Sequence, residues 1–330
     1  MTTAYAAMRD ALAVAEREGA EWTHDHRLDG RDLECIAASP EDPERAFVGT
    51  FEAGLHRTTD GGQTFERVGE ATVEQDAVLS AAVSPHDSDV VYVGTEPSRL
   101  YRSTDGGDTW ARVGGLTDLP SADEWSFPPR PDTHHVRWVE PDPHDPDRLY
   151  VGIEAGALLL TEDGGETWRE RPPGSRRDNH TLTTHPDAPG RAWSAAGDGY
   201  AETRDGGESW AHPESGLDHR YCWSLAVDPA DPDTVLMSAA SGAYSAHTAS
   251  RAESHLYRKR GDGDWFRLTN SPAGEGVVRA VLAAGDEAGE CYAATNEGLY
   301  RTADAGDHWE RVPVPWERFA EHTCRGLAVV

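Results

Sequence analysis

The chain has 330 residues, with 30 Lys and Arg against 59 Asp and Glu, so its formal net charge at pH 7 is −29. This balance excludes a nucleic-acid binder that recognises phosphate backbones through many basic side chains. Every basic residue except Lys259 is an arginine, and an acidic surface almost without lysine is typical of halophilic proteins, which must stay hydrated in concentrated salt. A GC-rich genome would explain the missing lysines but not the excess of carboxylates.

The hydropathy and cysteine patterns indicate a soluble chain. No run approaches the roughly 18 apolar residues that span a membrane, and no basic N-terminal segment precedes an apolar stretch. The cysteines form no CxxC pair and have no metal-ligand spacing; they are Cys35, Cys222, Cys291 and Cys324. We therefore expect a cytoplasmic monomer with reduced thiols, no membrane partner, no metal and no cofactor.

The first element, residues 4–22, begins with an alanine-rich stretch, residues 4–18, whose composition alone favours a helix. However, it aligns without a gap onto residues 291–309, and Tyr, Ala, Ala, Leu, Gly and Trp coincide. Residues 291–309 carry a strand, turn and aromatic pattern that recurs along the chain. The alignment therefore predicts two strands joined by an eroded turn at the N-terminus.

One octapeptide follows in five copies, which begin at Thr58, Ser103, Thr161, Thr203 and Thr302. Each copy lies between two short apolar stretches, which predicts a hairpin turn between two strands. Its Ser or Thr and its Asp can hydrogen-bond the backbone of the turn, and its glycines supply positive φ angles. A weaker copy at residues 256–265 keeps the strand, a glycine turn and the Trp.

Seven aromatic residues mark the repeats, at spacings of 42 to 58 residues: Trp22, Phe65, Trp110, Trp168, Trp210, Trp265 and Trp309. The residues after Trp309 and those up to Trp22 together make one further repeat. Repeats of about 40 to 50 residues with several short strands are the mark of a β-propeller. We therefore predict an all-β fold, a single seven-bladed propeller over residues 1–330 with four-stranded antiparallel blades. Residues 31–322 form six blades, and the closing blade takes its outer strands from residues 1–30 and its innermost strand from residues 323–330.

The octapeptide, Ser/Thr-x-Asp-x-Gly-x-Thr/Ser-Trp, resembles the Asp-box, or BNR, repeat of sialidase-like propellers. Relatives include photosystem II assembly factor-like propellers and xyloglucan-cleaving glycoside hydrolases. The resemblance covers essentially the whole chain and implies the fold but no particular activity, because in that family the box lies away from the ligand face. It also implies that the box aspartates are structural.

The same comparison narrows the enzymatic options. Sialidases of this type have six blades, a Phe/Tyr-Arg-Ile-Pro segment and an arginine triad, whereas this chain has no such segment and seven predicted blades. The xyloglucan-cleaving relatives look like two propellers that face each other across a cleft, and one propeller fills this chain. Neither chemistry is carried over.

Five predicted innermost strands end at a proline, and these prolines set a common register: Pro40, Pro85, Pro141, Pro186 and Pro229. Six residues earlier, or at the matching places of the last two blades, stand Glu34, Leu79, His135, His180, Trp223, Arg279 and Arg325. These side chains are expected at the channel mouth, on the face where the connections between blades enter. Two residues further along, the positions are mostly small or aliphatic. Arg137 is the exception, and we expect it to pair with Glu154.

Two insertions are predicted on the same face. Residues 114–133 carry Trp125, Phe127 and Arg130, and residues 241–254 carry Tyr244, His247 and Arg251. Long loops in a compact fold are usually functional lids or disordered segments, and the aromatic content favours lids.

The polar residues of the predicted mouth each have more than one possible role. Arg279 and Arg325 can clamp an anion, or they can pair with Glu34 across the closure of the ring. His135 and His180 can act as acid and base, share a metal, or form a hydrogen-bonded pair, and the pair is favoured because no third metal ligand is evident. Tyr221 and Trp223 can stack on a sugar or aromatic ring, or plug the channel.

Two functions follow. The first is a propeller that binds an anionic small molecule, a glycan or a protein segment at the channel mouth through Arg279, Arg325, Arg137, Tyr221, Trp223 and Glu154. The second is a glycoside hydrolase or lyase in which Glu34 and His135 or His180 are acid and base and Arg279 and Arg325 hold the anion. A glycosidase usually needs two carboxylates, and Glu154 or Asp198 would have to supply the second.

Overall fold

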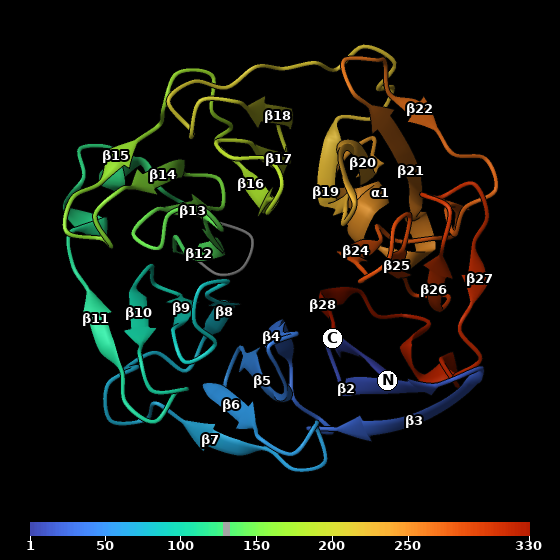
Figure 1. The fold of residues 1–330 in the computed structure, drawn as a ribbon, viewed down its shortest axis with the longest axis horizontal. Coiled ribbons are helices and arrows are strands. Elements are labelled where there is room, and N and C mark those ends of the chain that lie inside the picture. The colour runs from blue at the N-terminus through green and yellow to red at the C-terminus, as the bar shows by residue number, and fades with distance from the viewer. Residues whose placement is uncertain (128–132) are drawn as a thin grey trace.

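The computed structural model describes residues 1–127 and 133–330, which form seven sheets arranged as a ring around a central channel (Figure 1). The all-β, seven-bladed propeller predicted from the repeats is therefore confirmed. Helical structure in the described part of the chain is confined to α1 (Ala243–His247) and four short 3-10 turns. None of the described helices has the length and apolar character needed to cross a membrane.

Blades 1 to 3 each have four antiparallel strands, which follow one another from the channel outward. Blade 1 contains β4 (Leu33–Ser39), β5 (Asp42–Thr50), β6 (Leu55–Thr58) and β7 (Glu66–Val68). Blade 2 contains β8 (Val78–Val83), β9 (Val91–Thr95), β10 (Leu100–Ser103) and β11 (Ala111–Val113). Blade 3 contains β12 (Val136–Pro141), β13 (Leu149–Ile153), β14 (Ala157–Thr161) and β15 (Arg169–Glu170).

Blades 4 to 6 vary in their outer strands. Blade 4 contains β16 (Asn179–Thr184), β17 (Ala192–Ala196) and β18 (Gly199–Thr203), and a bridge between Glu202 and Ala211 stands for its fourth strand. Blade 5 contains β19 (Tyr221–Asp228), β20 (Asp231–Ala240), β21 (Glu253–Arg260) and β22 (Phe266–Arg267), with β23 (Gly274–Glu275) also paired to β21. Blade 6 contains β24 (Val281–Ala284), β25 (Cys291–Ala294), β26 (Leu299–Thr302) and β27 (Glu310–Arg311).

The closing blade is built from both chain ends, as predicted. Its strand order is β28 (Cys324–Val329), β1 (Thr2–Met8), β2 (Leu12–Glu18) and β3 (Glu21–Arg27). The alanine-rich N-terminus forms strands because its small side chains are buried where the blade packs against its neighbours, and Ala4 and Ala6 are almost fully buried. Pairing of β1 with β28 places Ala6 opposite Leu327, so the two termini lie side by side and β1 is paired along both of its edges (Figure 1).

The five octapeptide turns share one hydrogen-bond network. In the first, the Thr58 hydroxyl donates to Asp60 (2.7 Å) and accepts from the Gly62 backbone N–H (3.0 Å), while Asp60 accepts from the backbone and the hydroxyl of Thr64. The bonds from Thr64 and Thr58 lower the pKa of Asp60 to about 2. The aspartate is therefore saturated within its own turn, which holds the hairpin between the third and fourth strands.

A β-bulge occurs near the start of the innermost strand in six of the seven blades. In each bulge one residue has no partner on the neighbouring strand: Glu34, Leu79, Arg137, His180, Trp223 and Arg325. Bulges re-aim a side chain, and here they mark the ring of residues at the start of the channel. The register predicted for blade 3 is wrong by two residues: its pairing matches Pro143 rather than Pro141 to the other prolines, so Arg137 and not His135 holds this position.

Candidate functional site

The two ends of the channel differ in how they are filled. The innermost strands are buried at their starts and become partly exposed toward their ends, as in β8, where Val78 to Ser80 are buried and Ala81 to Val83 are not. The same gradient occurs in β16 and β24. The channel is therefore closed where the innermost strands begin, which we call the filled end, and accessible where they reach the proline turns, which we call the open end.

Trp223 lies at the centre of the filled end and is 3% exposed. The guanidinium carbon of Arg279 lies 3.9 Å from the centroid of its ring, and that of Arg137 lies 5.0 Å away. The rings of His180 and His247 approach to 4.3 and 4.5 Å. Of the two roles considered for Trp223, this packing is that of a plug.

Arg279 is fully buried beneath the second insertion. It donates to the carbonyl oxygen of Cys324 (2.5 Å) and through Nε to His247 Nδ1 (3.3 Å), and its Nη2 has no hydrogen-bond partner among the described residues. Burial and the nearby Arg325 hold the pKa of Arg279 well below its usual value, and burial together with Arg279 lowers that of His247. Helix α1 thus brings His247 onto the plug, where the Tyr221 hydroxyl hydrogen-bonds its Nε2 (2.9 Å).

Arg325 and Glu34 form an ion pair across the closure of the ring. Nε and Nη2 of Arg325 donate to the same oxygen of Glu34 at 2.8 and 2.5 Å, and Glu34 is 1% exposed. Although burial opposes the charge on Arg325, its pairing with Glu34 raises the pKa of the guanidinium. The predicted pairing of Arg325 with Glu34 is therefore present, and it uses the Nε and Nη2 groups of the guanidinium.

Glu154 lies among basic side chains of its own blade, His135 and Arg137, and of blade 4, His180. It accepts a hydrogen bond from His135 Nε2 (2.7 Å), and Arg137 Nε lies 3.7 Å away, as predicted. Burial opposes its ionisation, but the bond from His135 and the charges of His180 and Arg137 hold the pKa of Glu154 well below its usual range. The prediction that His135 and His180 form a hydrogen-bonded pair is wrong: His135 bonds Glu154, His180 bonds the Cys222 carbonyl oxygen, and within the described residues the two rings meet only through Glu154.

Two residues of the filled end behave differently from expectation. Asp178, which sequence reasoning missed, lies 3.8 Å from His180 Nε2; its position two residues before the bulge was the available signal. Asp198 accepts from the backbone N–H groups of Arg177 and Asp178 instead of facing Glu34.

In the first insertion, the ring of Phe127 packs edge-on against that of His135, with 5.2 Å between the ring centroids. Arg130, predicted in the same insertion, lies outside the described residues.

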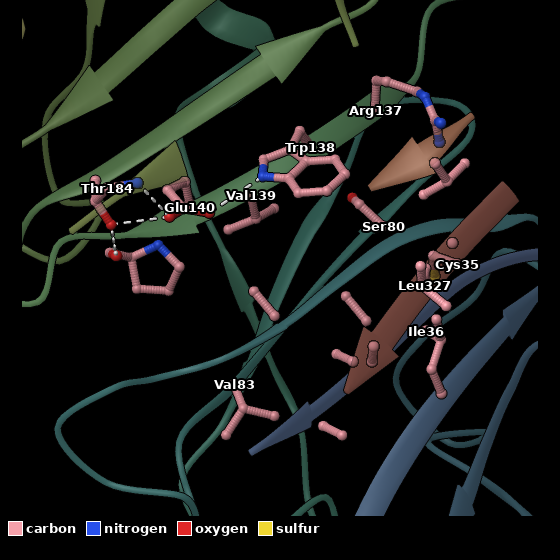
Figure 2. A pocket seen from close by; sticks show the side chains of 18 of the residues that line it. Cys35, Ile36, Ser80, Val83, Arg137, Trp138, Val139, Glu140, Thr184 and Leu327 are labelled. Carbon is pink, nitrogen blue, oxygen red and sulfur yellow. Dashed lines mark hydrogen bonds between the residues drawn. The ribbon is translucent and has the colours of Figure 1, made fainter. Parts of the chain in front are cut away.

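A cavity of about 380 Å³ occupies the channel at the open end. Figure 2 shows its apolar wall, which includes Ile36, Val83, Val139 and Leu327. Arg137 and Arg325 lie at its inner limit, whereas Glu34, His135, His180 and Arg279 do not line it. A second cavity of about 320 Å³ lies against blades 4 to 6 and shares Trp138 and Leu327 with the first.

Among the described residues, Glu140 is the one carboxylate in the wall of the first cavity, and sequence reasoning did not single it out. One of its oxygens accepts from the backbone N–H and the hydroxyl of Thr184, both at 2.8 Å, and the other accepts from Trp138 Nε1 at 3.2 Å (Figure 2). Burial raises the pKa of Glu140 to about 7, because the donors that stabilise it are neutral.

No family model matches the chain, and no curated protein matches it in sequence. Solved structures share its fold. An ancestral GH74 enzyme is 15% identical with a TM-score of 0.65, over 85% of this chain and 38% of its own, and the GH74 enzyme of Niastella koreensis is 17% identical with a TM-score of 0.63, over 84% and 46%. YCF48 bound to D1 peptide is 16% identical with a TM-score of 0.61, over 91% and 92%. The chain thus spans less than half of the two GH74 enzymes and nearly all of the YCF48 chain.

Proposed function

We propose that this propeller is a binding protein whose ligand is an anion with an apolar body, held in the channel at the open end. The apolar body would lie along Ile36, Val83 and Val139, and the anionic group would meet Arg137 and Arg325 at the inner limit of the cavity. Ligand pockets of this kind combine mostly apolar walls with a few polar groups that fix orientation.

The free hydrogen-bonding capacity of Arg137 carries this proposal. Within the described part of the chain its guanidinium donates no hydrogen bond; its contacts are Glu154 at 3.7 Å and the Trp223 ring. Its burial lowers its pKa, yet an arginine keeps its charge in proteins. A carboxylate, sulfate or phosphate would satisfy the fork of donors that the protein leaves unmet.

Two observations favour binding over catalysis, one from a protein of similar fold and one from Glu34. YCF48, which is similar in fold along nearly its whole length, was solved with a bound peptide, so a protein segment with a terminal carboxylate is one form the ligand can take. Glu34, the acid or base of a glycoside hydrolase or lyase, is 1% exposed, lies outside the cavity and is bound by Arg325. A buried, paired carboxylate has no access to a glycosidic bond.

The proposal also covers the type of the repeat, the halophilic character of the protein, its location and its oligomeric state. The octapeptide turns are proposed to be Asp-boxes, because their aspartates serve the turn alone. The charge of −29 and the single lysine support the proposal that the protein is halophilic, and a cytoplasmic monomer remains part of that proposal.

Isothermal titration with decanoate and decanol, which share an apolar chain and differ in charge, tests the proposal. Decanoate is expected to bind the wild type at least about tenfold more tightly than decanol, because only the anion meets Arg137. Arg137→Met is expected to abolish that preference, while Arg260→Met, which removes an exposed arginine at the end of β21, leaves it intact. Equal affinities for both compounds in the wild type, or an unchanged preference in Arg137→Met, would rule the proposal out.

A further inference from the structure

Three potential metal ligands from neighbouring blades meet at the rim of the filled end. Glu154 follows β13, Asp178 precedes β16, and His180 stands at the bulge of β16. One donor atom of each lies within 4.8 Å of the others, and His180 Nε2 is 3.6 Å from Glu154 Oε1 and 3.8 Å from Asp178 Oδ2. These distances exceed hydrogen-bonding range and are close to the separation of about 3.4 Å between two ligands of one tetrahedral ion.

The second polar atom of each residue is already held by the protein. His180 Nδ1 bonds the carbonyl oxygen of Cys222 (2.7 Å), Glu154 Oε2 accepts from His135 Nε2 (2.7 Å), and Asp178 Oδ1 accepts from the Ala155 backbone N–H (2.9 Å). Such outer contacts orient ligands in metal sites. They leave one atom per residue, Oε1, Oδ2 and Nε2, and these three atoms face one another.

The Nε2 atom of His180 is a second, independent observation that points to a metal ion between these groups. The residue is 1% exposed, and its Nε2 atom is buried without a hydrogen-bond partner among the described residues. Because Nδ1 faces the carbonyl oxygen of Cys222, Nε2 is the nitrogen that remains for a metal ion, and it lies toward the carboxylates of Glu154 and Asp178. Both carboxylate oxygens lie beyond hydrogen-bonding range of Nε2, and an ion between the three atoms would satisfy a buried nitrogen that the described residues leave without a partner.

We propose that Glu154, Asp178 and His180 bind one divalent transition-metal ion, with zinc as the best match. One imidazole with two carboxylates suits zinc, whereas calcium requires six or more oxygen ligands. Three protein ligands leave a fourth position for water or a ligand atom. The side chain of Asp178 is 29% exposed, so an ion can reach the site from the rim.

A glycine, Gly197, leaves the room that this cluster occupies. Gly197, which follows β17, lies so close that a Cβ atom there would collide with Asp178 Oδ2 and approach His180 Cε1 at 3.2 Å. The sequence predicted no metal because His135 and His180 had no third ligand. The structure changes this, since His135 serves as the outer partner of Glu154 and Asp178 completes the set.

Zinc titration of the tag-free protein after dialysis against EDTA tests the site. The wild type is expected to bind one equivalent of Zn²⁺ and to gain thermal stability on binding, because the ion binds the folded state. Asp178→Asn keeps an oxygen for the Ala155 N–H but loses a ligand charge, and should bind zinc about 10 to 100 times more weakly. Asp187→Asn, which neutralises an exposed carboxylate on the same blade, is the matched control and should bind like the wild type.

X-ray absorption at the zinc edge separates this site from binding elsewhere. Nitrogen and oxygen neighbours near 2.0 Å without a sulfur shell near 2.3 Å are expected, since the four cysteines are buried and none of them belongs to the proposed ligand set. Absence of stoichiometric binding to the wild type would overturn the proposal. Binding by Asp178→Asn with wild-type affinity, or a sulfur shell, would overturn it equally.

Discussion

The two ends of one channel place the same chemical group in opposite electrostatic settings. Glu154 at the filled end meets His135 and Arg137, and its pKa lies well below the usual range. Glu140 at the open end meets only the neutral donors of Thr184 and Trp138, and its pKa is raised to about 7. Both carboxylates belong to blade 3, so their pKa values differ because of the side chains around them at each end of the channel and not because of the blade.

This difference indicates that the two ends of the channel have separate roles. At the filled end, buried guanidinium, imidazole and carboxylate groups contact one another around Trp223. These contacts join blades 3 to 6, the closing blade and blade 1. At the open end the walls are apolar and partly exposed, and space remains. The proposed ligand would therefore enter from the open end and meet charged groups that the packing already holds in place.

Removal of residues 324–330 is expected to have the largest effect, because β28 contributes to both ends. It supplies Arg325 to the filled end and Leu327 to the wall of the open end, and it covers the edge of β1. The truncated chain should lose cooperative thermal unfolding or melt far below the wild type. Arg325→Met, which removes the charge but keeps the strand, should retain a cooperative transition. An unchanged melting temperature after truncation would contradict the closure of the ring by β28.

Substitution of one residue at each end provides a direct comparison of their packing. Trp223→Ala removes a fully packed indole and should lower the free energy of unfolding by about 3 to 5 kcal/mol. Val83→Ala at the partly exposed wall of the cavity should cost about 1 kcal/mol or less. Equilibrium unfolding in urea measures both. Losses of similar size would show that the open end is packed as tightly as the filled end.

Sequence reasoning recovered the features that depend on local chemistry. The octapeptide turns repeat one set of side-chain to backbone bonds, so their spacing alone gave the strands, the blade number and the pairing of β1 with β28. The contact of Arg137 with Glu154 was predicted from the cost of a buried, unpaired guanidinium.

Features that depend on side-chain packing and strand register could not be predicted from the repeats. Two prolines close together in blade 3, Pro141 and Pro143, gave two possible registers, and only the position of the bulge decides between them. The accessible end of the channel depends on how Trp223 and His247 pack, and no repeat encodes that. Asp178 lies before β16, outside the repeated strand pattern, so that pattern does not indicate its place in the cluster. Glu140 lies in β12, and its place in the cavity wall depends on the register of that strand.

The raised pKa of Glu140 gives the smallest expected effect and the sharpest test of the contrast between the ends. Its pKa in the folded state, about 7, exceeds the unfolded value near 4.3, so the folded state binds the extra proton between these values. Its contribution to stability is therefore fully present below about pH 4.3 and is lost as the pH rises through 7. Glu140→Gln has no such proton to lose, although its amide faces the Trp138 N–H and should cost about 1 kcal/mol at every pH.

Urea unfolding of both proteins at a series of pH values from about 5 to 8 resolves these contributions. Relative to the wild type, Glu140→Gln should gain about 2 kcal/mol across this range, so that the two proteins are about equally stable at the acidic limit and the variant is the more stable one at the basic limit. Glu166→Gln, an exposed carboxylate of the same blade, corrects for the loss of one negative charge from an acidic chain. If the curves for the wild type and Glu140→Gln run parallel, Glu140 is ionised as readily as the carboxylates of the filled end, and the electrostatic distinction between the two ends fails.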